Sequence, residues 1–122
     1  MCLNVYIPAI VPIPPPNAVI INNKLIAALD ANIFPILCFG ENIDDDYHEA
    51  IPKILDKYLK DVENIEFIIF AYEPIFAIGT GALPNRKRIE EVISFVNEYL
   101  EDKYKKKPNY MVVLLIVVIL MI

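Results

Sequence analysis

Short apolar runs alternate with longer amphipathic segments along the middle of this 122-residue chain, and this alternation restricts its fold more than any other feature. Residues 33–39 and 67–72 are predicted strands, because each is a short run that is apolar on both faces. The segments 18–31, 46–62 and from 84 onward carry apolar residues at helical spacing. Strands that alternate with helices predict an α/β fold with parallel strands, in which the chemistry lies at the carboxyl ends of the strands.

Local signals mark the ends of the predicted helices. Asn32 suits the left-handed position that follows a helix. Asp46 and Glu49 have the spacing of a capping box, and Pro52 either kinks the next helix or marks its first turn. The last helix is expected to start near Pro84, because proline suits the first helical position. The helix capped by Asp46 should therefore connect two adjacent parallel strands.

Charge divides the chain into three parts. All charged residues lie between Ala18 and Lys107, so that a proline-rich tail (1–17) and an apolar end (108–122) flank a globular middle (18–107). The net charge of −5 argues against a nucleic-acid partner. Two cysteines and one histidine are too few for a disulfide framework or a zinc site, so no metal is expected. No cofactor is expected either.

The last twelve residues, 111–122, are all apolar. As a helix they would rise about 18 Å, well short of the roughly 30 Å hydrocarbon core of a membrane. Their many valines and isoleucines favour a strand that is buried or self-associating. A membrane segment remains the alternative interpretation.

One stretch carries a family signature. The sequence AYEPIFAIGTG, residues 71–81, resembles the catalytic-glutamate and lid-loop motif A-Y-E-P-[VIL]-W-A-I-G-T-G of triosephosphate isomerases, and only Phe76 departs from it. KLIAALDANIFPILCFGE before it and RIEEVISFVNEYL after it resemble neighbouring segments of the same family, in the same order. The resemblance covers about residues 18–103 and implies a partial (β/α)8 TIM barrel of about three β/α units.

The resemblance also implies roles for individual residues. Glu73 corresponds to the general base of the family. Ile78 would exclude water, and Gly79 would bring its backbone N–H close to the substrate phosphate. The rest of the lid would be formed by Pro74, Ile75, Phe76, Ala77, Thr80 and Gly81. From the residues themselves, Glu41 is expected to be a structural polar group near the site, His48 a solvated surface residue and Cys38 a core residue.

Other parts of the family pattern have no counterpart in this sequence. These are the N-terminal lysine motif, the catalytic histidine of H-S-E-R-R, and the Gly-Gly phosphate loops. We therefore expect a fragment of a glycolytic, cytoplasmic isomerase whose ends were read out of frame, inactive alone although its substrate class is triose phosphate. The alternative hypothesis is a non-catalytic association or membrane-surface module that uses residues 111–122. A split enzyme completed by another chain is a third hypothesis.

The chain is also expected to associate with copies of itself. A partial barrel leaves open sheet edges, which favour self-association. The interface loop of the family's homodimer lies upstream of the resembling region, so a homodimer of that type cannot be inferred.

Overall fold

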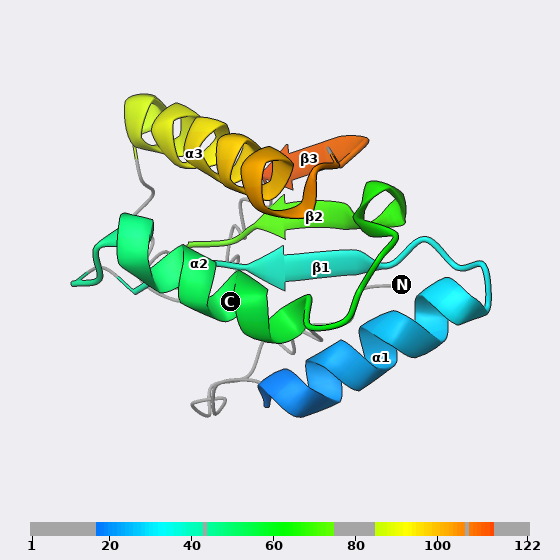
Figure 1. The fold of residues 1–122 in the computed structure, drawn as a ribbon. Helices are drawn as coiled ribbons and strands as arrows, with labels where there is room; N and C mark the ends of the chain where they lie inside the picture. Colours follow the sequence, from blue (N-terminus) through cyan, green and yellow to red (C-terminus); the bar gives the residue numbers. More distant parts are fainter. Residues whose placement is uncertain (1–16, 43, 75–84, 107, 114–122) are drawn as a thin grey trace, which may run out of the picture.

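The predicted alternation of helices and strands is confirmed by a computed structural model, which describes residues 17–42, 44–74, 85–106 and 108–113 (Figure 1). Along the chain, its elements are α1 (Ala18–Asp30), β1 (Ile36–Phe39), α2 (Tyr47–Tyr58), the 3-10 turn η1 (Ile65–Phe67), β2 (Ile69–Tyr72), α3 (Arg86–Tyr104) and β3 (Tyr110–Val113). Each connection between strands contains a helix, as parallel strands require.

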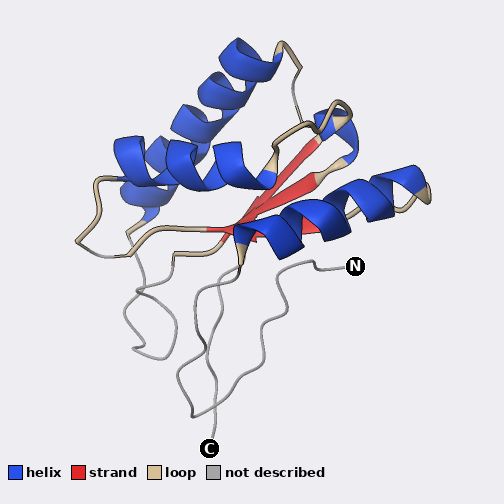
Figure 2. Ribbon diagram, turned by 60° about the horizontal axis from the view of Figure 1, so that its bottom comes forward, coloured by secondary structure: helices blue, strands red, loops and turns tan. Residues whose placement is uncertain are grey.

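The three strands form one parallel sheet in the order β1-β2-β3. Ile36 pairs with Ile69 at the start of β1 and β2, and Phe39 pairs with Tyr72 at their ends. The predicted pair of adjacent parallel strands with a connecting helix is thus confirmed. Helices α2 and α3 cover one face of the sheet, and α1 lies beyond β1 and packs against α2 (Figures 1 and 2).

The core lies between this sheet face and the helices. Its buried side chains are Ile21, Leu25, Leu37, Phe39, Ile51, Leu55, Tyr58, Leu59, Val62, Ile65, Ile68, Phe70, Tyr72, Val92, Val96 and Leu100. Phe39 contacts the rings of both Phe70 and Tyr72, so aromatic side chains fill the space between β1 and β2 on the helix side. The apolar stripes predicted for the helices are the surfaces that the structure buries.

Strands β1 and β2 both begin later than predicted. Ile33 ends the turn after α1, where its N–H donates to the carbonyl of Ala28, and pairing starts only at Ile36. The predicted strand from Phe67 was likewise wrong at its start, because residues 65–67 form the turn η1. The N–H of Phe67 donates to Asn64 O at 3.1 Å, which takes Phe67 out of the sheet.

The helix ends follow their local signals in part. Asn32 adopts a φ of 59° after α1, as predicted. Asp46 caps α2 by accepting a hydrogen bond from the N–H of His48, but Pro52 lies inside the helix and does not mark its first turn. α3 starts near Pro84, as predicted: Asn85 is the capping residue and the helix begins at Arg86.

The apolar end of the chain starts as a strand. β3 pairs with β2 through residues 110–113, which confirms strand structure at the beginning of the run. Residues 1–16 and 114–122 lie outside the described residues, so the division of the chain into three parts stays a prediction. Within the described stretches, no helix is both long enough and apolar enough to span a bilayer.

Candidate active site

The carboxyl ends of β1 and β2 bring two glutamates to one edge of the sheet. Glu41 follows β1 after Gly40, and Glu73 directly follows Tyr72, the last residue of β2. The N–H of Glu73 donates to the carbonyl of Phe39 at 2.7 Å, which extends the strand pairing by one step and fixes the backbone of Glu73 against β1. α2 and α3 begin at the same edge (Figure 1).

Glu73 is buried although it is a charged residue type. It is 6% exposed, and among the described residues no hydrogen bond or ion pair reaches its carboxyl group. Burial raises the pKa of Glu73 to about 7, because the ionised form loses its hydration. A carboxyl group with such a pKa can accept and return a proton near neutral pH.

Glu41 is also fully buried, but its carboxyl group accepts hydrogen bonds. Its Oε1 accepts a hydrogen bond from the hydroxyl of Tyr72 at 2.7 Å and another from Nη2 of Arg88 at 3.3 Å. Burial and the bond to Glu41 raise the pKa of Tyr72, so that its hydroxyl stays a donor. Oε2 of Glu41 has no partner among the described residues. The expectation that Glu41 is a polar group near the site is met by this geometry.

Arg88 was missed by sequence reasoning. It joins α3 to β1 through Glu41, and its guanidinium lies 4.5 Å from the ring centroid of Tyr47 at the start of α2. One signal could have revealed it. Residues 86–88 are all basic and lie in the first turn of a helix, where the helix dipole disfavours cations.

The predicted lid falls largely outside the described residues. This applies to Ile75, Phe76, Ala77, Ile78, Gly79, Thr80 and Gly81, whose assigned roles stay predictions. Pro74 is described and buried next to Glu73. The His48 side chain is 57% exposed and hydrogen-bonded to Asp46, as expected of a surface residue, and Cys38 is buried in β1.

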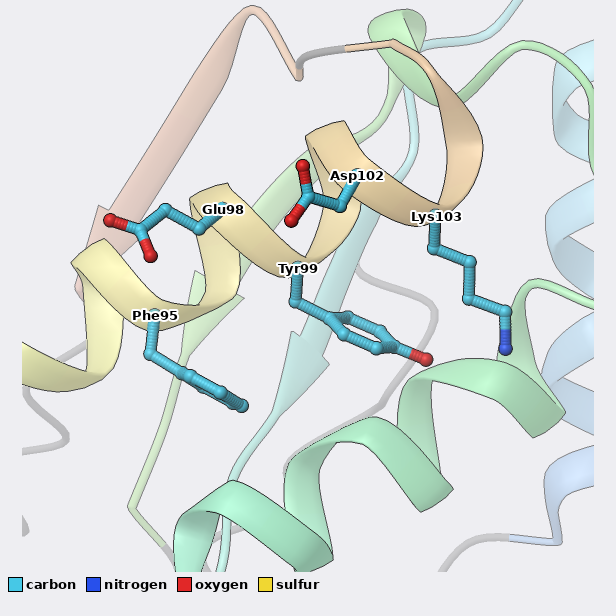
Figure 3. A pocket seen from close by; sticks show the side chains of 5 residues that line it. All are labelled: Phe95, Glu98, Tyr99, Asp102 and Lys103. Carbon is cyan, nitrogen blue, oxygen red and sulfur yellow. The ribbon is translucent and has the colours of Figure 1, made fainter.

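A separate pocket of about 350 Å³ is formed by α3 and is lined by Phe95, Glu98, Tyr99, Asp102 and Lys103 (Figure 3). Phe95, Tyr99 and Lys103 extend toward α2, whereas Glu98 and Asp102 lie along the other side of α3. None of these residues comes from the carboxyl end of a strand, so this pocket is distinct from the edge that holds Glu73. In the described parts of the chain, no three His, Cys, Asp or Glu residues are grouped as a metal ion would require.

The sequence of this chain is similar to one family of known proteins. The family model of triosephosphate isomerase matches residues 16–115. Triosephosphate isomerase of Clostridium tetani is 34% identical over 93 residues, which are 71% of this chain and 36% of that protein. The enzyme of Dehalococcoides mccartyi (strain ATCC BAA-2266) is 37% identical over 86 residues, which are 68% of this chain and 34% of that protein.

The chain thus spans about a third of the length of the curated relatives it matches. The matched region includes all three strands and all three helices of the structure. This agrees with the predicted class, a partial β/α fold with parallel strands. By its sequence match and its fold, the chain belongs to the triosephosphate isomerase family.

Proposed function

We propose that this chain supplies the general base, Glu73, to an active site that interconverts dihydroxyacetone phosphate and glyceraldehyde 3-phosphate. The single observation that carries the proposal is the buried carboxyl group of Glu73 at the carboxyl end of β2, within the family's motif. Triose phosphate is the substrate class and the cytoplasm the location, because this is a reaction of glycolysis.

The proposed reaction moves a proton between adjacent carbons through an enediolate, and Glu73 would take and return that proton. Its pKa of about 7 suits this task, because a base is most effective when its pKa lies near the working pH. The two other requirements are a donor at the substrate carbonyl oxygen and a binding site for the phosphate. The family's histidine, lysine and Gly-Gly loops serve them and have no counterpart in this sequence.

The 122-residue chain is therefore proposed to be inactive alone and active when a second chain brings the missing motifs. The test mixes it with a chain that carries the remaining strands of a relative and measures isomerisation of dihydroxyacetone phosphate. Activity should appear only in the mixture, and Glu73→Gln should lower it by about 10²–10⁴-fold. Glu90→Gln, which changes an exposed glutamate of α3, is the matched control.

The outcomes separate the hypotheses. If the mixture is equally active with the original chain and with its Glu73→Gln variant, the role of the carboxyl group is contradicted. Turnover by the chain alone that Glu73→Gln abolishes would contradict only the need for a second chain.

One observation favours the alternative, a non-catalytic association module. In the described part of the sheet, the outer edges of β1 and β3 have no neighbouring strand, and such edges pair readily with another chain. Sedimentation velocity of the purified chain should show concentration-dependent self-association, lessened by deletion of residues 111–122. A stable monomer at all concentrations would contradict this alternative.

A further inference from the structure

Gly40 lies where the carboxyl end of β1 meets the backbone of Glu73. A Cβ atom built on Gly40 would lie 1.7 Å from the carbonyl oxygen of Glu73, 2.6 Å from its carbonyl carbon and 3.2 Å from Cα of Pro74. All three neighbours are backbone atoms, so no side-chain rotation could make room for the added atom. Any residue other than glycine at position 40 must displace Glu73 or the end of β1.

The requirement for glycine here concerns space and not backbone conformation. The φ angle of Gly40 lies outside the left-handed region, so other residues could adopt it. The left-handed positions of the described chain are instead occupied by Asn32, Asp61 and Lys105. The close approach to Glu73 is therefore the feature of the structure that demands glycine at position 40.

Glu73 is fixed on two sides by this arrangement. Its N–H donates to Phe39 O at 2.7 Å, and its carbonyl group rests against Gly40. The backbone of Glu73 thus cannot move toward β1, and movement away would break the hydrogen bond to Phe39. We propose that Gly40 is a positioning residue for Glu73, and that its missing side chain allows the Glu73 carboxyl group to reach its buried place at the sheet edge.

The positioning of Glu73 by Gly40 can be tested without measuring any enzymatic activity. Its importance for catalysis rests on the proposed function. An alanine at position 40 would push the Glu73 carbonyl group away by roughly an ångström or more, since contacts below about 3 Å are not tolerated. Displacements of that size can cost a catalytic group about 10²-fold in rate. A displaced Glu73 would also be better hydrated, which should bring its pKa down toward the ordinary value of 4.5.

The test compares the intact chain with Gly40→Ala and with Leu25→Ala, a destabilising control in the buried face of α1. Carbon-13 NMR of labelled glutamate reports the pKa of Glu73, and hydrogen exchange reports the N–H of Glu73. Gly40→Ala should lower the pKa by about 1 unit or more and speed exchange of this N–H at least roughly tenfold relative to Leu25→Ala. Unchanged values in Gly40→Ala would overturn the proposal.

Two further outcomes are decisive. If Glu73 of the intact chain titrates near the ordinary value of 4.5, the environment required by the proposed function is contradicted, and hydrogen exchange alone then decides the role of Gly40. If Gly40→Ala does not fold, Gly40→Ala/Pro74→Gly is measured, because glycine at position 74 lets the backbone yield. A folded double variant with a lowered Glu73 pKa supports the proposal, and one that also fails to fold overturns it in favour of a purely structural role.

Discussion

The pKa values of two carboxyl groups in this molecule, those of Glu73 and Asp56, are shifted in opposite directions. Asp56 lies on α2 and receives hydrogen bonds from three groups of α3: the hydroxyl of Tyr99, the hydroxyl of Tyr104 at 3.3 Å and Nζ of Lys103 at 2.7 Å. Burial opposes its ionisation, but these donors prevail and lower the pKa of Asp56. At Glu73, no described residue supplies such a donor, and burial raises the pKa to about 7.

The difference shows which of the two carboxyl groups is suited to chemistry. Asp56 is ionised, fully engaged and placed between two helices, so its role is to hold α2 against α3. Glu73 is buried at a strand end without a described cation beside it, an arrangement that stability alone does not favour. Groups that are kept in such a costly environment are candidates for catalysis.

The largest expected change in stability concerns Arg88, which pairs with the buried Glu41 and not with Glu73. Arg88→Met should lower the free energy of unfolding by about 3 kcal/mol, because it leaves the buried Glu41 carboxylate without its cation. The measurement is urea unfolding at neutral pH. Arg86→Met, on the same helix but in an exposed pair with Glu90, is the control and should have no measurable effect. If Arg88→Met is equally neutral, Glu41 does not depend on this ion pair.

The next effect is the pH dependence of the folding stability that arises from Glu73. Its pKa is raised on folding, so the folded state holds the proton more tightly, and ionisation costs stability as the pH rises from the ordinary pKa of 4.5 to about 7. Glu73→Gln should therefore be more stable than the original chain by on the order of 2 kcal/mol at about pH 8, with the advantage lost by about pH 4. Unfolding curves across this range check the trend, with the exposed Glu98→Gln as control. An advantage that does not grow with pH would contradict the burial argument.

The smallest effect is expected at Asp56 and has the opposite sign. Its folded pKa is lowered, so its contribution is present above the ordinary pKa of 3.8 and is lost as the pH falls through the folded pKa. Asp56→Asn should destabilise the chain by about 0.5–1 kcal/mol at neutral pH, a modest value because the group is partly solvated. Thermal unfolding from neutral pH down into acid should show a loss of stability that is full at neutral pH and shrinks as the pH falls below the ordinary pKa of 3.8. A loss of stability that does not shrink at all as the pH falls would mean that the hydroxyl contacts, and not the charge, stabilise the pair of helices.

Much of the fold could be predicted from short-range patterns. The buried face of α1, with Ile21, Leu25 and Ala28, follows from helical spacing, and Asn32 ends the helix as its side chain type suggests. The strand starts could not be predicted in the same way. Phe67 is apolar yet 44% exposed, because the turn η1 directs Ile65 into the core instead.

The candidate site was predictable only where a motif marked it. Glu73 was identified through the residues around it, whereas its burial depends on how β1 and β2 pair. The ion pair of Glu41 and Arg88 joins residues that are 47 positions apart, so no local pattern contains it. The need for glycine at position 40 likewise arises from a contact with Glu73 across the sheet, which only the structure reveals.

One titration can show whether Glu73 is suited to proton transfer while Asp56 is a structural anion. Carbon-13 NMR of the intact chain with labelled aspartate and glutamate follows both carboxyl groups in a single sample. We expect a titration midpoint of about 7 for Glu73 and one below the ordinary 3.8 for Asp56. A midpoint for Glu73 at or below its ordinary value of 4.5 would contradict this expectation.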